Sequence, residues 1–461
     1  TVLVAKKYLL KKMVNANHNL EDAVVDAMLD SGKSSTTFLP NGTPLSLCIL
    51  PDKVTRNNHP LSVHKMITMV QSCVAKSKQG TTTVVQVGGV EHPGPIAAAI
   101  AKAFPLYSRK TRKKDDEDKE EPDASTVILS CLNEELQVLE DSSASAAAAA
   151  EGVRLAGRLM DATPEELTTS AFSKECRLIA DRFSDCVTMT EIIGTDLDKQ
   201  GYGGIYGVGK AAECPPRLVV LEYEPPTNSK ETVALVGKGI VYDTGGLSLK
   251  SKDGMPGMKH DMGGAAGMLG GFLAAVSLKV DRKVKLVLCL AENAIGPTAF
   301  RNDDILTLYS GKTVEVNNCD AEGRLVLGDG VAHATQHFEG CDLVVDMATL
   351  TGAQLVATGK THAGILANSL DLEQRAVKAG LLSGDLVYPM VYAPEMLMGE
   401  FDSKVADMKN SVKDRGNAQA SCAGHFIEAH IHEDYTGGWL HVDMAGPGSK
   451  DQRGTGYGVG L

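Results

Sequence analysis

The chain has 461 residues, of which 43% are hydrophobic and 23% are charged, a composition typical of globular proteins. This length exceeds what one ordinary core organises, so we expect two or three domains. The formal net charge of −12 argues against nucleic acid as the main partner, because phosphate binding requires a basic surface. No apolar run reaches the roughly 18–20 residues that a membrane span needs, so we expect no membrane partner.

The first third alternates short apolar runs with helical patterns. Strands are expected at Leu45–Leu50, Thr83–Val87 and Thr126–Leu129, and helices at Leu61–Ala75 and Ile96–Phe104. This alternation predicts a small N-terminal α/β domain over residues 1–140.

Two segments differ from this pattern. Residues 109–123 carry almost no apolar side chain, so we expect a mobile surface loop there. Residues 141–162 are rich in alanine, the best helix former, and predict a helix that connects two domains. The glycine-rich stretch Gly201–Gly209 precedes a strand, which excludes a dinucleotide fingerprint and favours a flexible loop or close backbone packing.

The remainder, residues 163–461, contains apolar runs without strict alternation, which indicates strands buried on both faces. We therefore expect a larger C-terminal catalytic domain of α/β class, with a mixed, mainly parallel central sheet covered by helices. The expected strands are at Leu218–Leu221, Val233–Val236, Val284–Ala291, Leu343–Met347 and Trp439–Met444, and a small-residue helix is expected at Gly263–Ala275.

Ten cysteines are scattered along the chain without a CxxC pair. Several lie in apolar runs, as Cys289 does, where a free thiol behaves as a small hydrophobic side chain. We expect reduced core cysteines and a cytoplasmic protein.

Three acidic clusters follow expected strands or precede expected helices, where functional groups gather in an open α/β sheet. They are VALVGKGIVYDTGG, GMKHDMGGAAG and NNCDAEGRL, which contain Lys238, Asp243, Asp261, Asp320, Glu322 and Arg324. Each cluster alone is weak evidence, because an aspartate near two glycines is usually a turn residue. Together, converging carboxylates would repel one another unless cations neutralise them, and two divalent metals are the usual solution.

The two blocks VGKGIVYDTGGLSLKSKDGMPGMKHDMGGAAG and NCDAEGRL resemble the signature of the leucine aminopeptidase (cytosol aminopeptidase) family. The resemblance extends from about Leu155 to Leu461, and Val405–Gly424 is similar to the probable aminopeptidase-like branch of that family. The resemblance does not include the N-terminal third. One departure is Cys319, where the family usually has threonine; we interpret it as a packing change rather than a metal ligand.

The resemblance implies two divalent metal ions per subunit. The tight site would consist of Lys238, Asp243, Asp261 and Glu322, and the exchangeable site of Asp243, Asp320 and Glu322. Zinc is expected in the tight site, and manganese, magnesium or cobalt would be tolerated in the other. Lysine binds a metal only as the neutral amine, so we expect two adjacent cations to lower its pKa.

The implied reaction is hydrolysis of the N-terminal residue from peptides with a free N-terminus, by a water that bridges the metals. Lys250 would polarise the scissile carbonyl, and Arg324 would hold a bicarbonate ion that acts as the base, with Gly323 and Leu350 beside it. The side-chain pocket would comprise Met258, Thr349 and Gly352 and prefer leucine and other apolar residues. The family also implies a homohexamer.

Other interpretations are weaker. The two GKT tripeptides lack the glycine spacing of a phosphate loop. We interpret His425, His430 and His432 as structural or surface residues, and Trp439 as a core residue. An aminopeptidase-like scaffold that mainly binds a partner, with weak or no catalysis, stays as the alternative; a two-metal phosphohydrolase would need histidine-rich ligands that the motifs lack.

Overall fold

The computed structural model describes residues 1–18, 20–32, 34–74, 81–88, 93–111, 126–139, 143–227 and 229–461. Most of the charged segment 109–123 therefore lies outside the described residues. The chain divides into two compact units: residues 1–151 with 381–384, and residues 152–380 with 385–461. The division falls inside helix α5 (Ser143–Asp161). The domain boundaries predicted from the sequence, at residues 140 and 162, remain a prediction.

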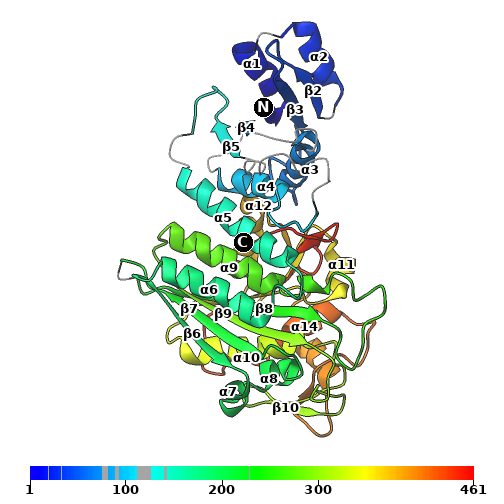
Figure 1. Ribbon diagram of the computed structural model, residues 1–461. Helices are drawn as coiled ribbons and strands as arrows, with labels where there is room; N and C mark the ends of the chain where they lie inside the picture. The colour runs from blue at the N-terminus through cyan, green and yellow to red at the C-terminus, as the bar shows by residue number, and fades with distance from the viewer. Residues whose placement is uncertain are drawn as a thin grey trace. The chain divides into compact units, whose positions relative to one another are not determined.

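The N-terminal unit is built on a five-stranded sheet of order β2-β3-β1-β4-β5 (Figure 1). Strand β2 runs antiparallel to β3, and the other neighbours are parallel. Alternate residues of β1 face opposite sides: Val2 and Val4 join one apolar cluster, and Leu3 and Ala5 the other. The elements are β1 (Val2–Lys6), α1 (Lys7–Asn17), α2 (Asp22–Asp30), β2 (Ser35–Phe38), β3 (Pro44–Leu50), α3 (Val63–Val74), β4 (Thr82–Val87), α4 (Gly94–Ala103) and β5 (Val127–Leu132).

The C-terminal unit contains an eight-stranded sheet of order β14-β13-β16-β12-β8-β9-β7-β6. The four central strands β16, β12, β8 and β9 are parallel, and an antiparallel strand joins each flank. The fold class predicted from the sequence, a mixed and mainly parallel sheet, is confirmed. The strands are β6 (Val187–Ile193), β7 (Arg217–Tyr223), β8 (Thr232–Asp243), β9 (Lys283–Asn293), β12 (Leu343–Ala348), β13 (Ala363–Ala367), β14 (Val387–Pro389) and β16 (Gly438–Asp443).

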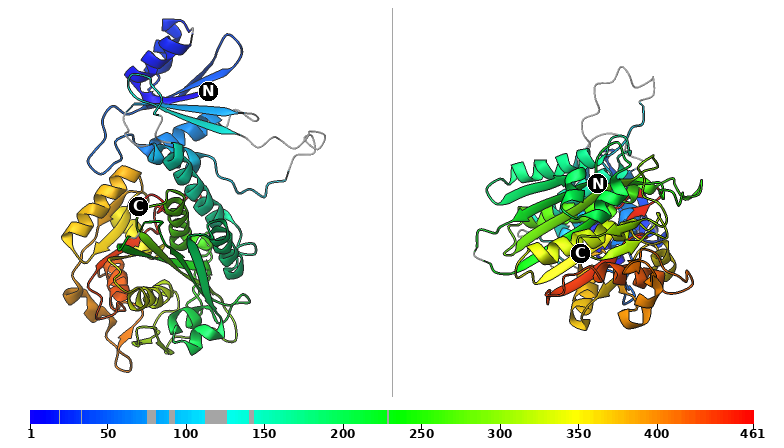
Figure 2. Two further views of the ribbon diagram at one scale, coloured as in Figure 1. Left: turned by 90° about the vertical axis from the view of Figure 1, so that its left-hand side faces the viewer. Right: turned by 90° about the horizontal axis from the view of Figure 1, so that it is seen from below.

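Helices cover both faces of this sheet, as the edge-on view in Figure 2 shows. One apolar cluster lies under α6 and α9, and the second lies under α8, α10 and α14. Strands covered on both sides lack polar alternation, which explains the continuous apolar runs of the sequence. The helices are α6 (Thr169–Arg182), α7 (Thr195–Lys199), α8 (Gly203–Gly209), α9 (Gly263–Ser277), α10 (Gly323–His337), α11 (Gly352–Thr358), α12 (Leu370–Ser383), α13 (Pro394–Leu397) and α14 (Gln419–Glu428).

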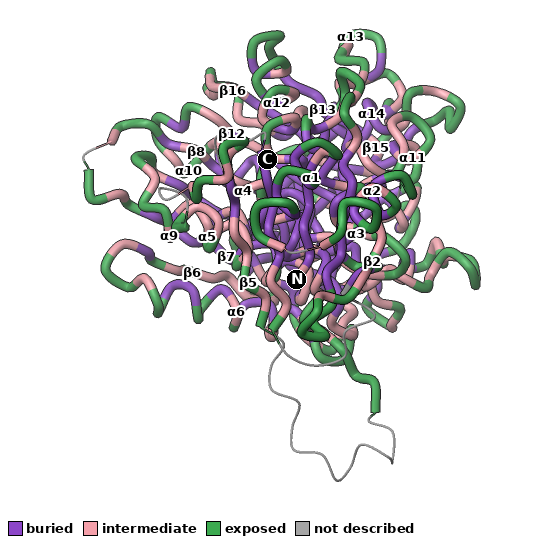
Figure 3. Tube along the Cα trace, turned by 90° about the horizontal axis from the view of Figure 1, so that it is seen from above, coloured by how far each residue is buried: buried purple, intermediate pink, exposed green. Residues whose placement is uncertain are grey.

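Smaller elements complete the unit. They are the 3-10 turns η3 (Met258–His260) and η4 (Met398–Phe401), and the short strands β10 (Ile305–Thr307), β11 (Thr313–Glu315), β15 (Met408–Lys409), β17 (Ser449–Lys450) and β18 (Arg453–Gly454). Figure 3 shows that buried residues gather in the interior of the trace and that exposed residues follow its outer loops. Among the described residues, no helix combines the length and apolar character needed to cross a bilayer.

The glycine-rich stretch is a helix, not the flexible loop that was one of its two interpretations. In α8, a β-carbon on Gly203 would stand 2.1 Å from the carbonyl oxygen of Thr307, and one on Gly204 would stand 2.3 Å from that of Leu325. These approaches confirm the second interpretation, close backbone packing. Trp439 is fully buried and donates its indole N–H to Asp346, as expected of a core residue.

Candidate metal centre

Strand β8 supplies the first two groups of the site, Lys238 and Asp243. Side chains five residues apart on a regular strand point to opposite faces. Here the pairing with β9 shifts: Ile240 is opposite Ala291, while Asp243 is opposite Asn293, so β8 contains one extra residue between them. Such a bulge reverses the alternation and brings Lys238 and Asp243 to the same side of the sheet.

Two helix beginnings supply three more carboxylates. Asp261 follows η3 and lies two residues before α9, while Asp320 and Glu322 directly precede α10. The N-terminus of a helix carries partial positive charge, which stabilises nearby carboxylates. Candidate ligand atoms of Asp243, Asp320 and Glu322 all lie within 4.8 Å of one another. The structure therefore brings the predicted acidic residues together.

Lys238 occupies the buried side of the cluster. Its Nζ lies 2.7 Å from Asp261 Oδ1 and 3.0 Å from Glu322 Oε1, and it donates to the carbonyl oxygen of Thr349 at 3.1 Å. Gly323 makes room for it, since a β-carbon there would stand 2.5 Å from Lys238 Cε. The lysine thus fills a space that only glycine at the start of α10 leaves open.

Lys250 occupies the more exposed side. Its Nζ lies 2.7 Å from Asp243 Oδ2 and also contacts Asp320. Lys250 is reached by a tight turn in which Gly245 and Gly246 have positive φ angles of 83° and 58°. That backbone conformation favours glycine, so the Gly-Gly pair after Asp243 shapes the site rather than filling a generic loop.

The charges of this cluster shift the pKa values of its members. Burial favours a neutral amine at Lys238, but Asp261 and Glu322 outweigh it and raise the pKa of Lys238 above its ordinary value. Burial raises the pKa of Asp261 to about 6, although Lys238 opposes that shift. Burial and the neighbouring Asp243 raise the pKa of Glu322 to about 8. Without metal, the site retains protons that metal ions would have to displace.

Several polar atoms of the site are buried and lack a hydrogen-bond partner among the described residues. They include Asp261 Oδ2, Glu322 Oε2, and Nε and Nη1 of Arg324. Buried polar groups are normally paired, so such atoms need an explanation. The free carboxylate oxygens fit divalent cations, and the free guanidinium N–H groups fit an anion such as bicarbonate. Burial lowers the pKa of Arg324 to about 10.

The other predicted residues lie in these places. The Thr349 hydroxyl donates to Asp261 Oδ1 at 2.9 Å, and Met258 is half-buried in η3. A β-carbon on Gly352 would meet open space. Leu350 already donates its N–H to Asp443 Oδ1 at 3.1 Å, which leaves its carbonyl and side chain as the groups that another ligand would meet.

Three positioning residues were missed from the sequence. Asn293, at the end of β9, donates to Asp243 Oδ1 at 2.8 Å, and Asp443, at the end of β16, accepts from the Thr351 hydroxyl at 2.6 Å. Asn410 donates to the carbonyl oxygens of Asn318 and Ala321 and so holds the DAEGR loop. The first two offered a signal, a polar residue that ends an apolar strand.

Cys319 and the histidines agree with their structural interpretations. The Cys319 thiol donates to the Phe300 carbonyl at 3.5 Å and belongs to an apolar cluster. His425 and His430 are buried and hydrogen-bond to Glu428 and Ser310.

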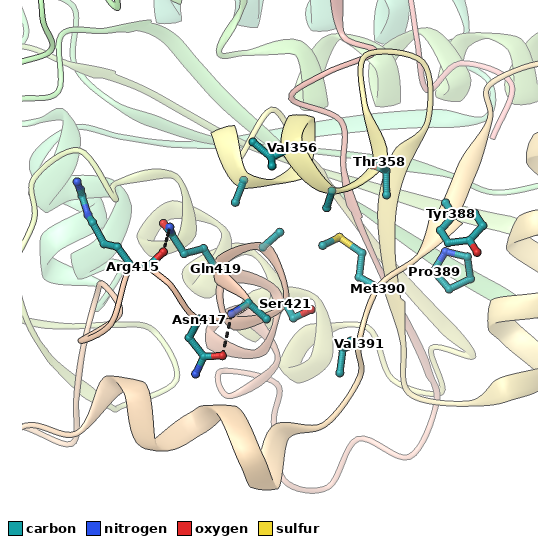
Figure 4. A pocket seen from close by; sticks show the side chains of 14 residues that line it. Val356, Thr358, Tyr388, Pro389, Met390, Val391, Arg415, Asn417, Gln419 and Ser421 are labelled. Carbon is teal, nitrogen blue, oxygen red and sulfur yellow. Dashed lines mark hydrogen bonds between the residues drawn. The ribbon is translucent and has the colours of Figure 1, made fainter.

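A cavity of about 670 Å³ lies between α11 and α14 and is lined by none of the predicted site residues. Figure 4 shows Val356, Met390 and Val391 around it, with Arg415 at its rim. Its walls are mainly apolar. The acidic-cluster residues with unpartnered polar atoms are not among the residues that line it. The acidic cluster, and not this cavity, is therefore the candidate site.

Two protein-family models match the chain. Residues 154–461 match the model of the cytosol aminopeptidase family, catalytic domain, and residues 7–113 match that of the M17 aminopeptidase N-terminal domain 2. The human "Probable aminopeptidase NPEPL1" is 46% identical over 437 residues, which cover 92% of this chain and 82% of the relative. "Leucine aminopeptidase 1" of Caenorhabditis elegans is 40% identical over 473 residues, and the match covers 100% of this chain and 93% of that relative.

Solved structures match over the whole chain. The leucyl aminopeptidase from Trypanosoma brucei in complex with bestatin is 38% identical, with a TM-score of 0.92 and coverage of 100% of this chain and 89% of that chain. The Caenorhabditis elegans leucine aminopeptidase structure is 36% identical, with a TM-score of 0.88 and coverage of 100% of this chain and 93% of that chain. The N-terminal unit, which the sequence motifs left unmatched, is thereby included. The predicted resemblance is confirmed: the chain belongs to the cytosol aminopeptidase family of metal-dependent aminopeptidases.

Proposed function

We propose that this chain is a dinuclear leucyl aminopeptidase that removes leucine and other apolar residues from the free N-terminus of peptides. Lys238, Asp243, Asp261 and Glu322 would hold the tighter ion, and Asp243, Asp320 and Glu322 the exchangeable one. The observation that carries this proposal is the convergence of four carboxylates around two lysines, with buried oxygens left unpaired. Zinc suits the tighter set; manganese, magnesium or cobalt suits the all-oxygen set.

Bound divalent ions would supply an acidified water and a polarised carbonyl at neutral pH. Lys250 contributes a fixed positive charge, because Asp243 and Glu322 outweigh its burial and raise its pKa. Its ammonium pairs with Asp243 and Asp320 at the more exposed side. With those carboxylates bound to metal ions, the ammonium would be free to hold the oxygen of the scissile carbonyl as negative charge develops there. Asn293 and the Gly245 N–H fix the orientation of Asp243 during this step.

Arg324 is the proposed holder of bicarbonate. Its guanidinium is planar, and its Nε and Nη1 have no partner among the described residues. An anion beside the guanidinium would offer acceptor oxygens to unpaired N–H groups, and a bicarbonate held there would accept the proton released when the peptide bond is attacked. Gly323 and Leu350 would complete this anion site.

Substrate selection is assigned to Met258, Thr349 and Gly352. An apolar pocket rejects charged side chains but separates similar aliphatic ones by only about 1–3 kcal/mol, so the preference should be broad. We also propose a cytoplasmic homohexamer, on the family resemblance, and native mass spectrometry of the purified protein would measure the subunit number.

The test is hydrolysis of leucine-p-nitroanilide after loading with zinc and manganese, with Asp320→Ala as the paired variant. We expect turnover by the metal-loaded chain and a large loss in the variant. No turnover by metal-replete protein, with an identical result for Asp320→Ala, would instead support the alternative of a partner-binding scaffold. That alternative is not favoured, because every ligand type of the family is present.

A further inference from the structure

Two cysteines of the N-terminal unit face each other across its core. Cys48 lies on β3 and Cys73 in the last turn of α3, and their sulfur atoms are 3.6 Å apart. Both residues belong to the apolar cluster that α3 and α4 share with the sheet. Among the described residues, which include all ten cysteines, no other thiol–thiol hydrogen bond is found.

Hydroxyl groups make the surroundings of Cys73 unusually polar for a core. Hydrogen bonds from the Cys48 thiol, and then from Ser46, Ser72 and Ser34, outweigh burial and lower the pKa of Cys73 to about 6. The same contact and burial raise the pKa of Cys48. Ser34 Oγ lies 3.2 Å from Ser72 Oγ, and Ser46 Oγ lies 2.8 Å from Thr36 Oγ1.

Other buried thiols of the chain differ from this pair. Cys131 belongs to the same apolar cluster, and burial raises its pKa to about 11. Burial also raises the pKa of Cys289 well above its usual value. Thiolates react with oxidants and protonated thiols do not, so ordinary core cysteines of this protein should be inert. Cys73 combines a lowered pKa with a second thiol in contact, which are two of the features of redox-sensitive cysteines.

We propose that Cys48 and Cys73 are a reversible redox site that closes to a disulfide when a small hydroperoxide reaches Cys73. The Cys73 thiolate attacks one peroxide oxygen and breaks the O–O bond, which gives a sulfenic acid and, after protonation, one water. The Cys48 sulfur then attacks the sulfenic sulfur, and the hydroxyl leaves with the Cys48 proton as a second water. Two thiols are oxidised, and one hydrogen peroxide is reduced to two waters.

The geometry allows this closure with small movements. A disulfide requires sulfurs about 2.05 Å apart, so the pair must approach by roughly 1.5 Å, within reach of side-chain rotation. Cys73 is 8% exposed, which admits a small peroxide better than a bulky disulfide reagent. The bond would tie α3 to β3 and thereby restrain the helix against the sheet.

Peptide mapping by mass spectrometry tests the site on the intact full chain treated with hydrogen peroxide. We expect a Cys48–Cys73 cross-linked peptide, a loss of two hydrogens, a fall in free thiols from ten to eight, and full reversal by dithiothreitol. Cys131→Ser is the matched control and should cross-link like the unchanged chain. In Cys48→Ser, a dimedone adduct should appear at Cys73, because its sulfenic acid has no resolving thiol.

Oxidation confined to the less buried Cys186 and Cys214 would overturn the proposal, as would a reduced Cys48–Cys73 pair after complete oxidation of those two. The main readout uses the unchanged sequence, so it does not depend on whether a variant folds. It also needs no peptidase activity, so its failure is distinct from failure of the metal-centre proposal.

Discussion

The two lysines of the metal centre lie in very different surroundings. The Lys238 side is closed: side-chain exposures are 3% for Lys238, 8% for Asp261 and 2% for Glu322. The Lys250 side is open: the exposures are 15% for Lys250 and 33% for Asp320. Exchange of an ion requires water and a path. In the proposed function, the tighter ion would therefore lie beside Lys238, and the exchangeable ion, with the substrate carbonyl, would lie beside Lys250.

Glu322 belongs to both proposed ion sets, so its removal should impair ion binding on both the closed and the open side. For Glu322→Gln we expect kcat to fall by roughly a thousandfold, because the metals supply several kcal/mol of transition-state stabilisation. Steady-state kinetics with leucine-p-nitroanilide and elemental analysis of bound metal would measure the effect. The control Glu339→Gln, at an exposed position, should match the unchanged chain. Full activity with two bound ions in Glu322→Gln would contradict the assignment.

Lys250→Met tests the open side alone. Removal of one positive group that stabilises a developing oxyanion costs roughly a hundredfold in kcat. We expect this loss at saturating metal, with the tighter ion still present by elemental analysis. Lys252→Met, an exposed lysine two residues away, is the matched control. A fall confined to metal content, restored fully by excess metal, would assign Lys250 to charge balance instead.

The pH dependence of the metal-free protein tests the closed side. The folded pKa of Glu322 is raised to about 8, above its ordinary value of 4.5. A group with a raised folded pKa contributes stability below the unfolded pKa and loses it as pH rises through the folded pKa. Between about pH 5 and pH 8, the free energy of unfolding should therefore fall more in the unchanged chain than in Glu322→Gln. Parallel curves from urea titrations of the two metal-free proteins would refute the shift.

Cys319→Thr should have the smallest effect, since the hydrogen bonds of its thiol go to Phe300 and Asn302 and not to a predicted metal ligand. The thiol contacts the Phe300 carbonyl, which a threonine hydroxyl also reaches as a donor. We expect the free energy of unfolding to change by less than about 1.5 kcal/mol, with unaltered metal content. Thermal unfolding and elemental analysis would check this. A changed metal content would place Cys319 at the metal centre after all.

The sequence by itself determined the fold class, the main strands and the family, and it predicted the residues of the candidate site. Apolar runs of four to eight residues marked β8, β9, β12 and β16, because strands buried on both faces need no polar alternation. The signature blocks predicted the ligands Lys238, Asp243, Asp261, Asp320 and Glu322. A candidate site built from the ends of strands and the starts of helices draws its residues from short contiguous motifs, which can be recognised in the sequence.

Only the tertiary structure decided how these residues meet. The bulge between Ile240 and Asp243 depends on the pairing of β8 with β9, which no local pattern encodes. Asn293, Asp443 and Asn410 gain their roles from contacts with residues 50 to 93 positions away along the chain. The Cys48–Cys73 pair likewise forms across 25 positions. The difference between the closed and open lysines is likewise one of burial, a property of packed neighbours rather than of sequence.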